Sequence, residues 1–521
     1  MWVHLRRRLA IMNFKQNIAT NYASQIYVML ISIVILPLYI KYMGAETYGL
    51  VGFFAIFQAV FNLLDMGLTP TMARETGRFS SGAVDSLNYK RFVRALEGIF
   101  VAVGILGAGI ILCASGYISR KWLHANQLPV SEIRTAVQLM AVIGALRWMC
   151  GLYRGAVTGA EHLVWLAWYN TFIATLRFVG ILPILMYVNS TPTVFFCYQL
   201  FVAIVELAGL SLASYYILRI IPRGVVGRWS WKPLRPMLKF SSTIAFTSAV
   251  WVIATQSDKL ILSKTLPLAD YGYYTLAVLV ASGVMVVSGP VGGALLPRMV
   301  KLEAEGDHAG LIRIYRQSTQ LVAVVAGGGA IALAFCAESL LRLWTGNMVL
   351  TQKAAPILSL YAMGNGVLAM SAFPYYIQYA KGDVKLHFFA SFAWLVLMIP
   401  SIIWASLHYG GVGAGYVWLG LNVISFVVWV PLVHNRFVPG LNFQWYRDDV
   451  LKIYLFAGLI GYCLSTIMPH SDSRYWLAVQ VGLMGLLVVS AGVLASSVLR
   501  CKLKQIIWRQ RHFTSIMNEN V

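Results

Sequence analysis

The chain has 521 residues, of which 59% are hydrophobic and 12% are charged, with a mean hydropathy of +0.70 and a formal net charge of +22. Soluble proteins carry roughly 25% charged residues, so this chain has too little polar surface to dissolve as a globule, and its apolar content excludes disorder. The same content excludes a nucleic-acid-binding protein despite the positive charge. The composition predicts an all-α polytopic membrane protein.

The N-terminal segment, residues 1–17, is predicted to be a cytoplasmic anchor. Residues 6–8 are all arginine, and no small-residue cleavage site follows them, so a removed signal peptide is not indicated. Met1 and Met12 are both open as the true start. The chain has six cysteines and no Cys-x-x-Cys motif, so no disulfide framework, metal site or cofactor is predicted.

Fourteen apolar stretches follow, each near the length of about 20 residues that a spanning helix needs. They are too long and too apolar for the strands of a membrane barrel, which alternate with period two. Backbone groups in lipid must be satisfied internally, so the stretches are predicted to be helices. The predicted spans are 18–40, 49–72, 95–118, 135–153, 164–187, 194–218, 241–263, 271–297, 318–341, 355–379, 388–408, 412–433, 453–469 and 475–498.

The lysine and arginine residues between these spans predict the orientation. With the N-terminus inside, the inner segments hold 30 of the 41 basic residues and the outer segments hold eight. Cytoplasmic loops carry the excess of basic residues, so both termini are predicted to be cytoplasmic. Topology and attraction to an anionic inner leaflet therefore account for most of the net charge.

An internal repeat relates residues 14–75 to residues 238–299. Each copy has an apolar span, then a Tyr-Gly pair (Tyr48-Gly49 and Tyr271-Gly272), then a second span. Six spans separate the copies, so they have the same orientation, which predicts two parallel six-helix lobes. The predicted organisation is an N-lobe at 18–218 with spans 1–6, a basic linker at 219–240, a C-lobe at 241–433 with spans 7–12, two further spans at 434–498 and a basic cytoplasmic tail at 499–521.

The three remaining basic residues lie inside predicted spans. They are Arg147, Arg177 and Lys259. An ionisable group near the middle of a bilayer costs at least about 2.5–3.5 kcal/mol, so it usually faces a cavity or a partner. Arginine suits a diphosphate because its planar fork donates two parallel hydrogen bonds and stays charged. Arg147 and Arg177 are therefore candidates for a cationic cavity, and the alternative is an internal salt bridge.

Four further residues belong to this hypothesis. Arg154 lies seven residues after Arg147 on the same helical face, although it also fits the inner end of its span. Glu206 is either the partner of an arginine or a proton- or sodium-coupling carboxylate. Asp258 is a candidate for coupling or substrate binding with Lys259, and as neighbours the two are expected to point about 100° apart and neutralise each other poorly. Asp65 lies where Gly67 and Pro70 should break the helix, and it is expected either to act in coupling or to cap freed N–H groups.

Three stretches carry a resemblance to a known family. Residues 41–49 (KYMGAETYG) resemble the LG-x-x-x-YG stretch after the first span of polysaccharide flippases, and residues 64–68 (LDMGL) resemble their LDLGL. Residues 256–262 (QSDKLIL) and 271–274 (YGYY) resemble their D-[KR]-x-x-[IL]…G-x-Y in span seven. Methionines 43 and 66 stand where leucine is commoner. With fourteen spans, the chain resembles the O-antigen-type branch of the multidrug/oligosaccharidyl-lipid/polysaccharide (MOP) exporter superfamily.

The resemblance implies a transporter and not an enzyme. Such proteins move undecaprenyl-diphosphate-linked oligosaccharides from the inner to the outer leaflet of the bacterial inner membrane by alternating access, and an ion gradient drives several of them. It also implies a place in the biosynthesis of O-antigen and lipopolysaccharide, of capsule, or of another exopolysaccharide. The implied partners are the lipid-linked oligosaccharide, membrane lipids, and polysaccharide polymerase and chain-length proteins.

Three alternatives stay open at this point. A lipid II flippase shares fourteen spans and a cationic cavity. A multidrug exporter of the same superfamily usually has twelve spans and an anionic cavity. A membrane glycosyltransferase or polymerase is less favoured, because the outer loops are short, the longest being 119–134. There is no Gly-Lys dipeptide, so no Walker A loop is present.

Overall fold

A computed structural model describes residues 20–505 except 66, 219–251, 254, 469–472, 502 and 504. The described residues form helices, and an isolated β-bridge joins His124 to Pro267. The predicted linker at 219–240, the N-terminal anchor and most of the C-terminal tail lie outside the described residues. The chain forms two compact units, residues 1–272 and 273–521.

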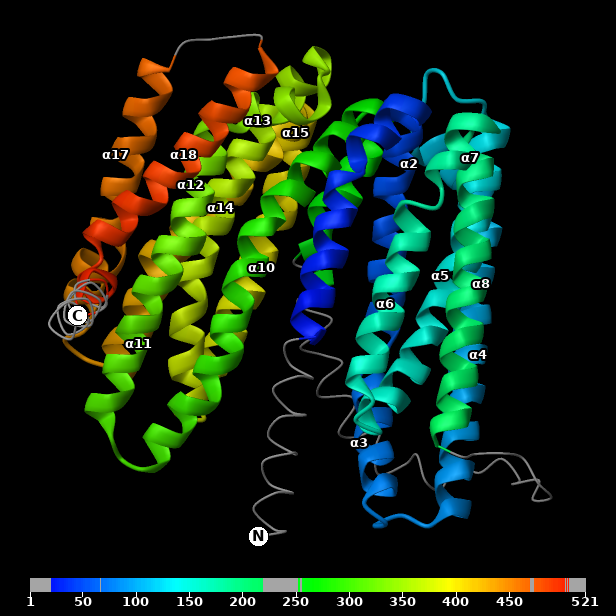
Figure 1. Cartoon of the computed structure of the whole chain (residues 1–521), viewed down its shortest axis with the longest axis horizontal. Coiled ribbons are helices and arrows are strands. Elements are labelled where there is room, and N and C mark those ends of the chain that lie inside the picture. Colours follow the sequence, from blue (N-terminus) through cyan, green and yellow to red (C-terminus); the bar gives the residue numbers. More distant parts are fainter. Residues whose placement is uncertain are drawn as a thin grey trace, which may run out of the picture. The chain divides into compact units, whose positions relative to one another are not determined.

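The first unit is built from long helices and short connectors (Figure 1). Residues 20–34 are helical and lead into the first labelled helix. The elements are α2 (Leu36–Leu64), α3 (Leu68–Ser80), α4 (Ser86–Tyr117), the π-helical turn η1 (Ile118–Trp122), α5 (Val130–Gly159), α6 (Leu163–Phe178), α7 (Leu182–Tyr187) and α8 (Pro192–Ile217). Helix α5 packs against α2, α3, α4 and α8, so it is the central helix of this unit.

The second unit is also built from long helices joined by short connectors. Helix α10 runs into it from the first unit. Helix α14 packs against α12, α13 and α15, and the pair α17 and α18 packs against α12. The elements are α10 (Leu268–Ala304), α11 (His308–Val322), η2 (Ala323–Gly327), α12 (Gly328–Phe335), α13 (Ala337–Thr345), α14 (Met348–Ala380), α15 (Lys385–Phe437), α16 (Asn442–Gln444), η3 (Trp445–Leu451), α17 (Lys452–Ile467) and α18 (Arg474–Ala495).

Eleven helices among the described residues are long and apolar enough to cross a membrane. Two of them contain a non-helical glycine where the sequence predicts a boundary between spans: Gly44 in α2 (φ 81°) and Gly410 in α15 (φ 59°). Positive φ is easy only for glycine, so these residues let the chain turn between spans. The 53 residues of α15 therefore hold the two predicted spans 388–408 and 412–433. Most of the predicted span 241–263 lies outside the described residues.

Two breaks shape the helices further. Helix α2 ends at Leu64 and α3 begins at Leu68 after Gly67 (φ 74°), which confirms the break expected at that point. The predicted span 318–341 is interrupted as well, because Cys336 has φ −105° and ψ 14° between α12 and α13. This second break was not expected from the sequence, because no proline or glycine stands next to Cys336.

Several helices expose large apolar side chains, as is typical of surfaces that face lipid. Ile105 and Leu106 on α4 are 70% and 65% exposed, and Trp404 and Leu407 on α15 are also exposed. Large contiguous apolar surfaces are rare on soluble monomers. The inward faces hold the aromatic core instead; in the first unit the Phe100 and Trp148 rings stack with centroids 4.3 Å apart. That contact fixes the part of α5 that carries Arg147.

The two Tyr-Gly pairs of the predicted repeat lie against each other's segments. A Cβ atom on Gly49 would collide with the carbonyl oxygen of Leu268, and one on Gly272 would lie 2.7 Å from the carbonyl oxygen of Ala45. Both glycines are thus required by close backbone approach and not by positive φ. Tyr48 and Tyr271 are buried beside them.

Gly49→Ala is expected to destabilise the protein by about 1–3 kcal/mol, because the new methyl group has no space and the backbone must shift. Gly109→Ala on α4 is the matched control, since nothing lies within 4 Å of its Cβ position and alanine favours the helix. Thermal unfolding of the purified proteins in detergent measures both. Equal melting temperatures for the two variants would contradict the close contact.

Candidate functional site

Three arginines and one glutamate gather in the first unit, on helices α5, α6 and α8. Arg147 and Arg154 are seven residues apart on α5, and seven residues are two turns, so both side chains leave the same face. Gln199 and Glu206 repeat that spacing on α8. The two helices pack together, so residues 147 and 199 meet, and residues 154 and 206 meet one step further along.

Glu206 is the centre of the cluster. Its side chain is 2% exposed, and its two carboxylate oxygens accept hydrogen bonds from different arginines. Oε1 accepts from Nη2 of Arg154, and Oε2 accepts from Nη2 of Arg177 at 2.6 Å. The geometry therefore supports the interpretation of Glu206 as a partner of arginines, namely Arg154 and Arg177.

Arg147 has a different environment. Its Nη2 donates to Oε1 of Gln199 at 2.7 Å, and its guanidinium carbon lies 5.3 Å from the centroid of the Phe54 ring. Gln199 also donates from Nε2 to the backbone oxygen of Arg177 at 3.1 Å, so one amide links two of the arginines. A neutral amide satisfies a hydrogen bond without cancelling the charge. The expected salt bridge is therefore formed by two of the three arginines and not by Arg147.

The cluster holds more positive charge and more donors than its own groups use. Three guanidinium groups face one carboxylate, which leaves two positive charges in excess. The Nε atoms of Arg147, Arg154 and Arg177 are buried and have no hydrogen-bond partner in the described part of the chain, and neither does Nε1 of Trp148. Buried donors are normally satisfied. The arrangement is suited to an anion that offers several oxygen acceptors.

Asp258 and Lys259 form a separate ion pair on the helical residues 255–265. Lys259 Nζ lies 3.3 Å from Asp258 Oδ1 and donates to the backbone oxygen of Thr255 at 2.7 Å. The expectation that these neighbours neutralise each other poorly is wrong, because the long lysine side chain bends back along the helix. Asp258 is 1% exposed, so its charge is held inside the protein.

Asp65 has the capping role that its position suggested. Its carboxylate accepts from the backbone N–H of Thr69 at 3.2 Å and from the Thr69 hydroxyl at 2.6 Å. Thr69 lies in the first turn of α3, whose N–H groups have no partner within the helix. The coupling role considered for Asp65 has no contact in its favour here.

Two carboxylates with several partners are not among the site residues predicted from the sequence. Glu46, beside the Tyr48-Gly49 pair, accepts from the backbone N–H groups of residues 126, 127 and 128 at 2.8–3.2 Å. Glu97 accepts from the hydroxyls of Tyr153 and Tyr215. Gln199 was also missed, although its spacing of seven residues before Glu206 is a signal that the sequence contains.

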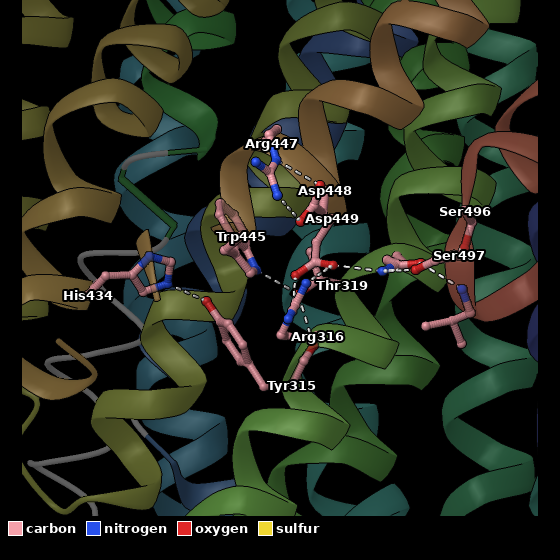
Figure 2. Close-up of polar contacts among 12 residues, drawn as sticks. Tyr315, Arg316, Thr319, His434, Trp445, Arg447, Asp448, Asp449, Ser496 and Ser497 are labelled. Carbon is pink, nitrogen blue, oxygen red and sulfur yellow. Dashed lines mark hydrogen bonds and ion pairs between the residues drawn. The ribbon is translucent and has the colours of Figure 1, made fainter. Parts of the chain in front are cut away.

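A buried polar network lies in the second unit (Figure 2). Arg316 donates to both oxygens of Asp449, from Nε at 2.6 Å and from Nη2 at 3.2 Å. Gln320 donates to Asp449 Oδ1 at 2.6 Å and accepts from Ser496 at 2.7 Å. The network thus joins α11 to η3 and to the residues after α18. Its groups bind one another, in contrast to the unused donors of the arginine cluster.

Among the described residues, no group of three or more His, Cys, Asp or Glu side chains is placed to hold a metal ion. The arginines, Glu206, Gln199 and the unused N–H groups around them make up the candidate site.

Comparisons with known proteins agree on the type of fold. A model of the polysaccharide biosynthesis protein family matches residues 14–303. The structure is similar to a lipid II flippase MurJ in an inward closed conformation, with a TM-score of 0.69 and 15% identity over 94% of this chain and 99% of that one. It is similar also to an inward-facing MATE-family multidrug resistance transporter of the MOP superfamily, with a TM-score of 0.62 and 14% identity over 78% of this chain and 94% of that one. No curated protein sequence matches significantly.

Proposed function

We propose that this chain, which belongs to the polysaccharide biosynthesis protein family, flips a lipid-diphosphate-linked glycan unit from the inner to the outer leaflet of a bacterial plasma membrane. Family and fold make it a membrane transporter of the MOP flippase type. We infer that the substrate is an undecaprenyl-diphosphate-linked oligosaccharide of the O-antigen or a related pathway. We infer also that the two repeats transport it by alternating access.

The arginine cluster is the observation that carries this proposal. A diphosphate is an anion with many oxygen acceptors, and arginine forks bind such oxygens in pairs. Two excess positive charges and the unused Nε–H groups of Arg147, Arg154 and Arg177 match that chemistry. Cationic drugs would be repelled by the same charges, which disfavours the multidrug exporter.

Glu206 would promote release of the substrate by competing with it for the arginines. Its carboxylate binds Arg154 and Arg177, so a diphosphate would have to compete with it for both guanidinium groups. A proton taken up by Glu206 would weaken its hold on the arginines and favour loading. Protonation of Glu206 would thus couple loading of the substrate to an ion gradient. The ion pair of Asp258 and Lys259 is a second candidate for coupling.

Binding of the lipid carrier tests the proposal directly. Purified protein in detergent is titrated with undecaprenyl diphosphate and with undecaprenol, which has the same chain and no phosphate. The diphosphate is expected to bind at least tenfold more tightly, because charge-assisted hydrogen bonds contribute about 1.5–3 kcal/mol each. Equal affinities would overturn the proposal.

Complementation then identifies the glycan. Lipid II also carries a diphosphate, so the cluster fits it equally well, and the lipid II flippase remains the second candidate. The chain is expressed in bacteria that lack an O-unit flippase and, separately, in bacteria depleted of their lipid II flippase. Surface glycan in the first strain is expected. Growth of the second strain alone would favour lipid II, and efflux of cationic dyes alone would refute a lipid-diphosphate substrate.

A further inference from the structure

Asn170 on α6 has a hydrogen-bonding character opposite to that of the arginine cluster. Its Oδ1 atom is buried and has no hydrogen-bond partner among the described residues. The unused groups of Arg147, Arg154 and Arg177 are N–H donors, whereas Oδ1 of Asn170 is an acceptor. Buried polar atoms are normally satisfied, so an acceptor without a donor points to a ligand that the arginines alone do not describe.

The positions of α6 and α8 place Asn170 level with Glu206. Gln199 on α8 donates to the backbone oxygen of Arg177 on α6 at 3.1 Å, which fixes one level at which the helices meet. From there, Glu206 lies seven residues further along α8, and Asn170 lies seven residues back along α6. The hydroxyl of Tyr169 donates to the backbone oxygen of Glu206 at 3.1 Å, so the helices run in opposite directions. Both steps therefore cover the same distance, about 10.5 Å.

Asn170 also lies on the face of α6 that the cluster uses. Arg177 follows it by two helical turns, and side chains at that spacing leave the same face. From this face Arg177 donates to Glu206 at 2.6 Å. Thr171, the next residue, points elsewhere, because its hydroxyl oxygen lies 2.9 Å from that of Ser24 on the helical residues before α2. Asn170 therefore belongs to the arginine cluster, and Thr171 does not.

The cluster is open to a ligand from the side of its arginines. The side chains of Arg154 and Arg177 are 40% and 22% exposed, whereas the side chain of Glu206 between them is 2% exposed. A diphosphate that competes with Glu206 for these arginines separates the carboxylate from them. The ligand then lies at the level of Asn170.

A glycan next to the diphosphate supplies the donor that Asn170 lacks. A diphosphate that links two organic groups has lost its acidic protons near neutral pH, so its oxygens only accept hydrogen bonds. The hydroxyl groups of the adjoining sugar donate, and they are only a few bonds away. Such a ligand offers acceptors to the arginines and a donor to Asn170, whereas the diphosphate alone satisfies only the arginines.

We propose that Asn170 is a specificity residue, which accepts a hydrogen bond from a hydroxyl or amide group of the first sugar. It thereby selects the carrier that is loaded with a glycan. This inference rests on the proposed function, because it assigns a further contact to the same site. A site built to hydrogen-bond a ligand group rejects an analogue that lacks the group, since the buried polar atom of the site is then left unpaired.

Two lipids of equal charge test this selection. Purified wild-type protein in detergent is titrated with undecaprenyl-diphosphate-glucose and with undecaprenyl methyl diphosphate, which has the same diphosphate diester and no hydroxyl donor. The glucose lipid is expected to bind about two- to tenfold more tightly, which is the range for one neutral hydrogen bond. Equal affinities of the wild type for the two lipids would overturn the proposal.

Variants assign the difference to Asn170. Asn170→Ala is expected to remove it, while both lipids still bind more tightly than undecaprenol. Asn170→Leu, which has a similar shape and no polar atom, takes its place if alanine impairs folding. Asn170→Asp keeps an acceptor and adds a negative charge, so it should weaken binding of both lipids and retain the ratio of their affinities. Thr171→Ala is the matched control and should leave the ratio unchanged, because its hydroxyl faces Ser24.

The outcomes separate this inference from the proposed function. An unchanged ratio in Asn170→Ala, at an unchanged melting temperature, would refute the role of Asn170 and leave the diphosphate site intact. Loss of the ratio in Asn170→Asp as well would show that the amide donates to the ligand, which contradicts the proposed contact. If neither lipid bound more tightly than undecaprenol, the proposed function would fail, and this inference with it.

Discussion

Arg177→Ala is expected to reduce surface glycan at least tenfold in a bacterium whose own flippase is deleted and which carries this chain at wild-type expression. The guanidinium of Arg177 binds one oxygen of Glu206 and retains an unused buried Nε–H. Its loss removes a charge-assisted partner of the proposed diphosphate substrate, and such bonds contribute about 1.5–3 kcal/mol. The readout is the amount of glycan on the cell surface.

Arg147→Ala is the companion variant and should act similarly, although its partner is an amide. Because Arg147 forms no bond with Glu206, its loss leaves the ion pairs of Arg154 and Arg177 intact. A defect in this variant therefore reports on substrate and not on the salt bridges. Arg134→Ala, exposed on the same helix, is the control. Full restoration of glycan by both cluster variants would leave flipping intact and refute the role of the arginines.

Asp449→Ala is expected to lower the free energy of unfolding by about 3 kcal/mol, at the low end of the range for breaking a buried ion pair. Asp449 is fully buried and receives hydrogen bonds from Arg316 and Gln320, so its loss leaves the Arg316 guanidinium without its carboxylate and removes one of the two acceptors of the Gln320 amide. Arg316 is 24% exposed, and water offsets part of the cost. Thermal or chemical unfolding of the purified protein measures the change.

The neighbouring residue supplies the control for this second prediction. Asp448 pairs with Arg447 at 3.0 Å, and the side chains of Arg447 and Asp448 are 63% and 31% exposed (Figure 2). Exposed pairs contribute about 0–1 kcal/mol, so Asp448→Ala should change stability little. The double variant Asp449→Ala with Arg316→Met should be more stable than Asp449→Ala alone. Similar losses for Asp448→Ala and Asp449→Ala would contradict the buried network.

Much of the fold could be predicted because the bilayer restricts the choices. Apolar stretches of about 20 residues mark helices, and the described helices α4, α5, α8 and α14 cover their predicted spans to within one residue. The break before α3 was predictable from Gly67 and Pro70. The break at Cys336 was not, because it depends on how α13 packs against α14 and α18 and not on any local helix-breaking residue.

The sequence allowed most residues of the candidate site to be predicted, but not which of them contact one another. Charges inside apolar spans identified Arg147, Arg177 and Glu206, since each needs a partner or a cavity. Which arginine meets the carboxylate depends on the axial positions of α5, α6 and α8, and no sequence pattern contains that information. Gln199 escaped notice because a neutral amide costs less to bury than a charge. The lysine at 259 reached Asp258 because a flexible side chain overrides the direction of its Cα–Cβ bond.

The pairing between α5 and α8 has a mechanical consequence. Arg147 meets Gln199 and Arg154 meets Glu206, and both contacts span the same 52 residues of sequence. Because both contacts have the same offset in sequence, sliding one helix along the other would break both contacts at once. The two helices are therefore expected to travel as a single rigid body in any large rearrangement. A ligand that displaced Glu206 would break the Arg154–Glu206 contact, while the Arg147–Gln199 contact would keep the two helices in register.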